Sequence, residues 1–316
     1  MKIIDASLQC LDEYEFTQEQ LFEWINLFGN IGIHDFIISK KIYQQIPFSQ
    51  VTGNEYYMFL EDEKEKVNYK EVKNFVLHKQ IKCDFITRIQ INDSREILQL
   101  RNYAAAKMVM LCGMEDFLCY DYKSILQKIL STLRGKQIIF CPDNDKDCAV
   151  ALATMFIHFG GAEVVGTFAG ISNHAPTEQL IISLRLTQRF KINQKLTDIV
   201  KIRDLYETVT GTKIPGKMPV IGSKIFQVES GIHIDGILKN QSNYETFPPE
   251  MVGQKREIIV GKHSGTNSIR YKAQELNLSC REEQLKHVLH EVKTKSVFLR
   301  RSLTEDEFAE IIRQGR

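Results

Sequence analysis

The sequence predicts an α/β protein: an abbreviated (β/α) TIM-type barrel of about six strands, followed by a small α-rich C-terminal subdomain. Short apolar runs alternate with amphipathic helical patterns through the first two-thirds of the 316 residues. This alternation is typical of a parallel sheet or barrel. Near residue 213 this alternation gives way to "KIPGKMPVIGSKIF", in which the proline and glycine residues are typical of a linker.

Six segments have the length and apolar content of strands. We expect them at residues 2–8, 34–39, 84–91, 107–111, 137–141 and 163–168. A complete eight-stranded barrel takes about 250 residues, whereas here the alternation stops near residue 190. Either the barrel is abbreviated or two strands escape the pattern.

Helical patterns fill the intervals. Thr17 and Gln20 have capping-box spacing ahead of one helix, and residues 122–133 and 149–161 have a helical period. The charged stretch 61–69 is expected to be a loop or the start of a helix.

The C-terminal part predicts two further helices. The first has its apolar face at Leu285, Val288, Leu289 and Val292. Thr304 and Glu307 have capping-box spacing at the start of the second. The predicted domains are a barrel at 1–212, a linker and first subdomain at 213–275, and a helical subdomain at 276–316.

Composition excludes several classes of function. The 41 basic and 40 acidic side chains nearly balance, so no net field favours nucleic acid or an anionic membrane. No apolar run is long enough to span a bilayer or serve as a signal peptide. The seven cysteines have no C-x-x-C spacing, which predicts free thiols in a reducing cytoplasm.

One segment carries a specific resemblance. "MPVIGSKIFQVESGIHIDGILKNQSNYETFPPEMVGQKREIIVGKHSG", residues 218–265, resembles the linker and first subdomain of homocitrate synthases and 2-isopropylmalate synthases. These are metal-dependent β/α-barrel enzymes that condense acetyl-CoA with a 2-oxoacid. The tail "VKTKSVFLRRSLTEDEFAEII" is similar to the end of the homocitrate synthases of nitrogen fixation. The resemblance implies that fold and that chemistry.

Upstream, the resemblance departs from the family at its chemical positions. In "DASLQC", Gln9 stands where the family has an arginine, and Cys10 where it has a metal-binding aspartate. In "FCPDNDKDCAVA", Cys141 and Asp143 replace two metal-binding histidines. A neutral glutamine lacks the charged fork of arginine, so the family's electrostatic catalysis should be severely weakened.

The end of the barrel shows the same departure. In "GTFAGISNHAP", Asn173 and His174 replace the Glu-Arg pair of the family. The family also has two strands between its fourth strand and its metal segment, whereas only about 25 residues separate 107–111 from 137–141 here. We therefore expect two central βα units to be deleted.

No bound metal is expected in this chain, and a divalent metal (Mg, Mn or Zn) is expected in a partner subunit. Cys10, Cys141 and Asp143 are weak candidate ligands, whose soft donors would suit zinc better than magnesium. The alternative is two buried thiols and a surface carboxylate, since free cysteine is often buried.

The resemblance implies a role for His233 and Tyr244. Their counterparts in the family reach from the subdomain into the barrel mouth of the neighbouring subunit. We therefore expect these residues to act in trans, His233 as an acid/base or orienting group and Tyr244 as a hydrogen-bond donor. The alternative is that the segment is a dimer clasp in which His233 is structural.

Three functions stay open. The first is a subunit of a homocitrate synthase-type acyltransferase, inactive alone, whose partner is a full-length homologue and whose assembly uses acetyl-CoA and a 2-oxoacid. The second is a regulatory pseudoenzyme that binds acyl-CoA or a 2-oxoacid. In place of a full-length homologue, the partner of this chain could be a second copy of itself. The third is an active homocitrate or 2-isopropylmalate synthase with altered ligands.

Overall fold

The protein is described by a computed structural model that covers residues 1–82, 84–114, 116–188 and 195–314. The chain forms two compact units: Met1–Ile214 with Pro219–Ile221, and Pro215–Met218 with Gly222–Arg316. The finer division at residues 212 and 275 stays a prediction.

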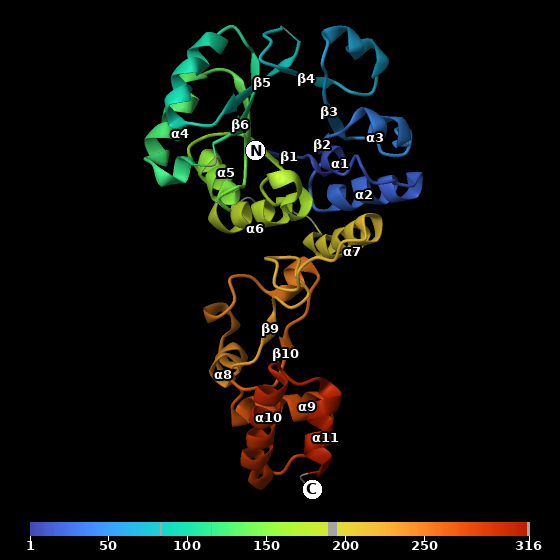
Figure 1. Ribbon diagram of the computed structural model, residues 1–316, viewed down its shortest axis with the longest axis vertical. Helices are drawn as coiled ribbons and strands as arrows, with labels where there is room; N and C mark the ends of the chain where they lie inside the picture. The colour runs from blue at the N-terminus through green and yellow to red at the C-terminus, as the bar shows by residue number, and fades with distance from the viewer. Residues whose placement is uncertain (83, 115, 189–194, 315–316) are drawn as a thin grey trace. The chain divides into compact units, whose positions relative to one another are not determined.

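The first unit is a closed barrel of eight parallel strands in chain order, in which the last strand pairs with the first (Figure 1). The strands are β1 (Lys2–Asp5), β2 (Asp35–Ile37), β3 (Glu55–Phe59), β4 (Asn74–His78), β5 (Ile86–Ile91), β6 (Met108–Gly113), β7 (Gln137–Pro142) and β8 (Glu163–Gly166). The β/α-barrel class is therefore confirmed.

The prediction of about six strands is wrong, because β3 and β4 escaped the sequence analysis. Each is only five residues long, and they flank the charged stretch, which forms the 3₁₀ helix η1 (Glu63–Asn68). Between β4 and β5, residues 79–85 form no helix in their described part, although parallel strands usually need a crossover of a dozen or more residues. Without an intervening helix, the βα alternation was not visible.

The expected deletion of two central units is also wrong. The segment 107–111, expected as the fourth strand, lies in the sixth, β6. The barrel is short because its connections are short, and not because strands are missing.

Helices surround the barrel where the connections are long enough. They are α1 (Ser7–Cys10), α2 (Gln18–Asn30), α3 (Lys40–Gln45), α4 (Tyr122–Thr132), α5 (Ala149–His158), α6 (Thr177–Thr187) and α7 (Ile199–Thr210). The remaining connections hold the 3₁₀ helices η2 (Ser94–Tyr103), η3 (Phe117–Cys119), η4 (Phe168–Asn173) and η5 (Leu196–Asp198). The capping box of Thr17 and Gln20 at α2 is confirmed.

Two apolar layers hold this unit together. Inside the barrel, inward side chains such as Ile4, Val76 and Ile139 form one buried cluster. Between the barrel and α2, Trp24 is fully buried, with its ring centroid 5.2 Å from that of Phe28. Because Trp24 is the single tryptophan of the chain, its fluorescence reports on the barrel alone.

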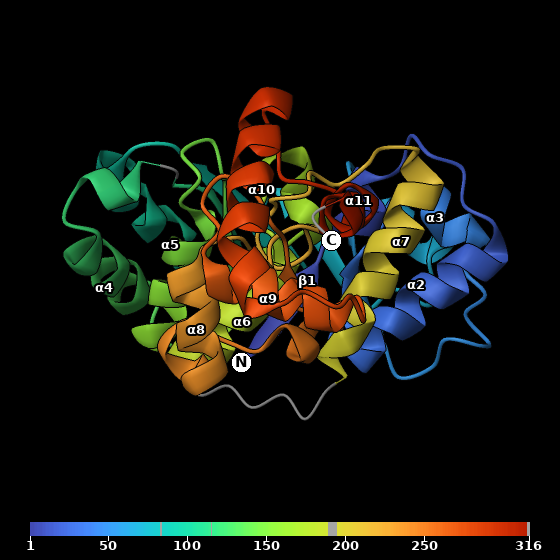
Figure 2. The ribbon, with the colours of Figure 1, turned by 90° about the horizontal axis from the view of Figure 1, so that it is seen from below.

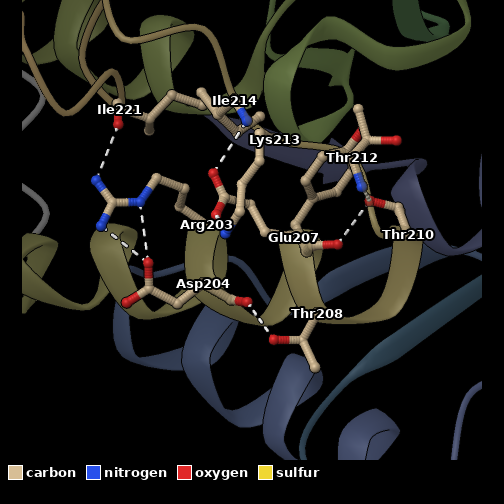
Figure 3. Close-up of polar contacts among 10 residues, drawn as sticks. Arg203, Asp204, Glu207, Thr208, Thr210, Thr212, Lys213, Ile214 and Ile221 are labelled. Carbon is tan, nitrogen blue, oxygen red and sulfur yellow. Dashed lines mark hydrogen bonds and ion pairs between the residues drawn. The ribbon is translucent and has the colours of Figure 1, made fainter.

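Hydrogen bonds from the last helix of the first unit hold the turn and the segment that follow it. α7 lies along α2 (Figure 2) and ends at Gly211, which has a left-handed φ of 68°. The carboxylate of Glu207 accepts hydrogen bonds from Lys213 Nζ at 2.6 Å and from the Ile214 backbone N–H at 2.9 Å (Figure 3). Arg203 donates to the Ile221 carbonyl at 3.2 Å, so the returning segment is tied to the same helix.

The described residues of the second unit form a two-stranded parallel sheet, four α-helices and three 3₁₀ helices. Its elements are β9 (Gln227–Val228), α8 (Gly231–Lys239), η6 (Gln241–Asn243), η7 (Pro249–Val252), β10 (Glu257–Ile258), α9 (Thr266–Glu275), η8 (Glu282–Gln284), α10 (Leu285–Leu299) and α11 (Glu305–Gln314). Leu285, Val288 and Val292 are buried in its core. The capping bonds between Thr304 and Glu307 are present, so both predicted C-terminal helices are confirmed.

No helix in the described ranges has the length and apolar character needed to cross a membrane. The cysteines at 10, 112, 119, 141, 148 and 280 are free thiols. Cys83, also predicted to be a free thiol, lies outside the described residues.

Three charged side chains form an ion cluster at the amino end of the barrel strands. We expect this cluster to stabilise the barrel against unfolding. Lys2 Nζ lies 2.8 Å from Asp35 Oδ1 and 3.1 Å from Glu55 Oε2, and the Asp35 side chain is only 11% exposed. We expect Lys2→Met to lower the free energy of barrel unfolding by about 2 to 4 kcal/mol, because it leaves a mostly buried carboxylate unpaired. The measurement is urea unfolding followed by Trp24 fluorescence.

The matched control is Arg95→Met, which removes a partner of Asp93 whose own side chain is 88% exposed. Exposed pairs contribute about 0 to 1 kcal/mol, so this variant should unfold close to the wild type. Equal midpoints for the Lys2 and Arg95 variants would contradict the role of the ion cluster.

Candidate functional site

The carboxyl ends of the strands enclose a cavity of about 370 Å³, at the end of a β/α barrel where active sites are built. Much of its wall is apolar. Its polar and thiol-bearing lining residues are Gln9, Cys10, Arg88, Cys112, Cys141 and His174. The structure brings together around one cavity four of the residues that the sequence analysis predicted to be altered family positions: Gln9, Cys10, Cys141 and His174.

Two cysteine thiols stand next to each other on the cavity wall. Cys112 on β6 and Cys141 on β7 are register partners in adjacent strands, and they are 3% and 4% exposed. Cys141 Sγ lies 3.7 Å from His174 Nδ1. A hydrogen bond from Cys141 and the nearby Arg88 charge lower the pKa of Cys112, whereas that same bond and burial raise the pKa of Cys141.

Arg88 is a functional candidate that the sequence analysis missed. Its Nε donates to Cys112 Sγ at 3.4 Å, and its guanidinium carbon lies 5.8 Å from the Phe59 ring centroid. Within the described ranges, no carboxylate lies at ion-pair distance from it. The signal was present, since an arginine within the apolar strand "ITRIQI" shares its face with the inward Ile86. The cavity therefore contains a cation that has no carboxylate partner among the described residues.

The other altered positions lie in two loops that are bonded together. Asp143 forms an antiparallel bridge with His174, and its Oδ2 accepts from Gln90 Nε2 at 3.4 Å. Asn173 Nδ2 donates to Asp145 Oδ1 at 2.5 Å. Asp143 and Asn173 thus join the loops after β7 and β8 beside the cavity.

Asp5, the last residue of β1, is fully buried. Its carboxylate accepts from the Ser7 backbone N–H at 3.0 Å and from Thr177 Oγ1 at 2.7 Å. Burial raises the pKa of Asp5 to about 6. Its bonds join β1 to the start of α6, which is a structural role.

The loop after β8 is strained. Ala169, Ser172 and Asn173 all have left-handed φ values, between 52° and 62°, a conformation that costs about 1 to 2 kcal/mol for a residue with a side chain. The Ala169 backbone N–H donates to Glu178 Oε2 at 3.0 Å. Oε1 of Glu178 is buried without a hydrogen-bond partner among the described residues, and burial raises the pKa of Glu178 to about 8.

The candidate metal ligands from the sequence, Cys10, Cys141 and Asp143, do not form a metal-binding group in the structure. In the part of the chain that the structure describes, no three His, Cys, Asp or Glu side chains are placed to hold a metal ion. Cys10 and Cys141 both line the cavity, whereas Asp143 is not among its lining residues, and the three do not form such a group. These residues do not fit a resident divalent metal.

The second unit carries the other predicted site. His233 on α8 is exposed, and its ring centroid lies 5.6 Å from that of Tyr244, which is 46% exposed. Both side chains line a cavity of about 430 Å³. A Cβ on Gly236 would lie 2.2 Å from the Tyr244 ring, so this glycine allows the tyrosine to pack against α8.

A partly buried ion pair fixes the segment that follows Tyr244. Arg256 Nε and Nη2 donate to the two oxygens of Glu245 at 2.5 and 2.6 Å. Bidentate pairs of this kind are geometrically specific. The pair therefore anchors the backbone next to Tyr244, while the Tyr244 ring stays accessible.

Comparison with known proteins gives matches along most of the chain. The family described as "Homocitrate synthase post-HMGL domain-like" matches residues 220–297. The chain is 30% identical over 259 residues to the homocitrate synthase omega subunit of Clostridium pasteurianum, covering 82% of this chain and 71% of that protein. It is 28% identical over 298 residues to the homocitrate synthase AksA of Methanocaldococcus jannaschii, covering 90% and 69%.

A probable 2-isopropylmalate synthase of Ignicoccus hospitalis is 34% identical over 201 residues, or 60% of this chain and 48% of its own length. Among solved structures, a hydroxymethylglutaryl-CoA lyase from Pseudomonas aeruginosa matches with a TM-score of 0.52 at 11% identity, covering 67% of this chain and 93% of that chain. At that identity the likeness concerns the fold alone.

The two buried carboxyls predict a pH dependence. A carboxyl whose folded pKa is raised binds its proton more tightly in the folded state, so stability falls as pH rises from the unfolded to the folded pKa. For Glu178 this window runs from about 4 to about 8, and for Asp5 it ends near 6. We expect barrel stability to fall between pH 6 and 8 by up to about 1.4 kcal/mol per pH unit.

Glu178→Gln should remove most of that slope, whereas Glu13→Gln, at an exposed position, should preserve it. Urea midpoints from Trp24 fluorescence at pH 6, 7 and 8 measure the slope. A wild-type midpoint that is flat over this range would contradict the raised pKa.

Proposed function

Because the chain belongs to the homocitrate synthase and 2-isopropylmalate synthase family, we propose that it is a subunit of a homocitrate synthase-type acyltransferase. The assembly would condense acetyl-CoA with 2-oxoglutarate. This chain would lack a metal and oxyanion site of its own and would contribute His233 and Tyr244 to an intact partner subunit.

The observation that carries the proposal is a contrast between the two units. His233 and Tyr244 are exposed, lie close together and line one cavity, as residues that act on another subunit must. The barrel mouth has Gln9, Cys10 and Cys141 where the family has charged and metal-binding groups. The omega-subunit designation of the Clostridium pasteurianum relative agrees with a protein made of unlike subunits.

The chemistry is divided between the subunits. The partner's barrel would hold the divalent metal, which polarises the 2-oxoacid as a Lewis acid. His233 would move or hold a proton at the reacting centre, a common role of a catalytic imidazole. Tyr244 would donate a hydrogen bond to a substrate oxygen, and the Glu245–Arg256 pair would keep it in place.

Arg88 favours a second candidate, a regulatory pseudoenzyme that binds a 2-oxoacid. A guanidinium that lines a cavity of about 370 Å³ and has no carboxylate partner in the part of the chain that the structure describes can bind a small carboxylate. Titration calorimetry with 2-oxoglutarate distinguishes this candidate: binding by the isolated chain that is lost in Arg88→Met would support it, and no heat of binding would exclude it.

An active lone synthase with altered ligands is the least supported of the three functions. It would need a working metal group, whereas the donors present in the described residues do not assemble one. Turnover by the isolated chain would establish it nevertheless.

The proposal predicts complementation. With acetyl-CoA, 2-oxoglutarate and Mg²⁺ or Mn²⁺, we expect no homocitrate from this chain alone and turnover when it is combined with a full-length homologue from the same source. His233→Ala should lower kcat of the assembly by about 10² to 10⁴, the usual contribution of an acid/base group. Product formation is followed by mass spectrometry, because the thiols of the chain would interfere with thiol reagents.

The matched control is Lys239→Gln, which removes an exposed charge on the same helix, α8. Gel filtration of each mixture checks that the subunits still associate. Failure to associate at micromolar concentration, or an unchanged kcat for His233→Ala within an intact assembly, would contradict the proposal.

A further inference from the structure

The Cys112 and Cys141 thiols have the geometry of a pair that can be bridged. They are register partners on adjacent parallel strands, so both side chains point to the same face, inside the barrel. Neighbouring strands lie about 4.8 Å apart, within the range of about 4.4 to 6.8 Å between Cα atoms that disulfides span. The backbone already holds the two residues at a bridging separation.

Each sulfur also has a polar neighbour that suits thiol chemistry. Arg88 Nε donates to Cys112 Sγ at 3.4 Å, which favours the thiolate that attacks a disulfide. His174 Nδ1 lies 3.7 Å from Cys141 Sγ, where a neutral imidazole can accept the second thiol proton. Buried structural cysteines ordinarily lack such partners and are inert.

The pair also has access to a small molecule. Both cysteines are buried from bulk solvent, but both line the cavity of about 370 Å³ at the carboxyl end of the barrel. This volume suits a compact reagent better than a large peptide. The three features together distinguish this pair from the remaining described thiols.

We propose that Cys112 and Cys141 form an oxidation site that closes to an intrachain disulfide by exchange with a small organic disulfide. This assignment does not depend on the proposed acyltransferase role. It requires only the barrel and its cavity.

The exchange proceeds in two balanced steps. The Cys112 thiolate attacks one sulfur of the disulfide RSSR, forming a mixed disulfide and releasing RS⁻, which is protonated to RSH. Cys141 then loses its proton to His174 and attacks Cys112 Sγ, which forms the intrachain bond and releases the second RS⁻; His174 returns the proton. Two protein thiols lose two electrons in total, and RSSR is reduced to two RSH.

Oxidation would change the cavity. The bridged sulfur of Cys112 can no longer form a thiolate, so Arg88 has only a neutral sulfur as acceptor in this wall. The guanidinium would then be freer to bind an anion in the cavity.

The test uses the full chain and 2-hydroxyethyl disulfide as the oxidant, followed by denaturation, alkylation of remaining thiols and peptide mapping. We expect the wild type to lose the mass of two hydrogen atoms and to yield one peptide pair linked through Cys112 and Cys141, which dithiothreitol separates. Alkylated Cys112 and Cys141 after treatment, with adducts confined to other cysteines, would overturn the proposal. This measurement needs no variant, so it does not depend on whether a cysteine substitution folds.

Variants assign the order of the steps. Cys141→Ser should stop at a mixed disulfide on Cys112, and Arg88→Met should slow formation of that adduct about tenfold, as expected for a less stabilised thiolate. Cys280→Ser, in the second unit, should oxidise like the wild type. An adduct that forms at the same rate in Arg88→Met would overturn the role of Arg88, and a Cys141→Ser protein without an adduct on Cys112 would overturn Cys112 as the attacking thiol.

Discussion

Closure of the sheet is the constraint on which the rest of the first unit depends. Four residues of β1 pair in register with β8, from Lys2 with Glu163 to Asp5 with Gly166. This pairing leaves no sheet edge open, and it places the first and last barrel segments of the chain side by side. Gln9 and Cys10, just after β1, therefore face the same cavity as His174, just after β8.

Closure also explains why some of the site could be predicted and some could not. Resemblance identified the segments after β1, β7 and β8, because each retains part of a family pattern next to its altered residues. It could not identify Arg88 or Cys112, because these lie within strands that read as apolar, where only the alternation along the strand separates inward from outward positions. That alternation becomes informative once the strand count and the inner face are known.

The strand count itself failed for a local reason. The charged stretch Glu61–Tyr69 separates β3 from β4 without a helical period, and only residues 79–85 separate β4 from β5. A search for alternating strands and helices detects only those strands that are followed by a helix. It therefore missed β3 and β4, which are joined to the next strand by short connections. The capping boxes at Thr17 and Thr304 and the apolar face of α10 were predictable, because each depends on neighbours within a few residues.

The connection between β4 and β5, whose described residues form no helix, has a consequence for how such a protein can change size. In a closed barrel, strand number, stagger and tilt are geometrically linked, so removing one strand would disturb all the others. The outer helices are not linked to one another in this way. Any one of them can be replaced by a 3₁₀ helix or a loop while the barrel stays closed. A β/α barrel can therefore become shorter by losing outer helices while it keeps all its strands. Chain length is a poor guide to the number of strands in the barrel.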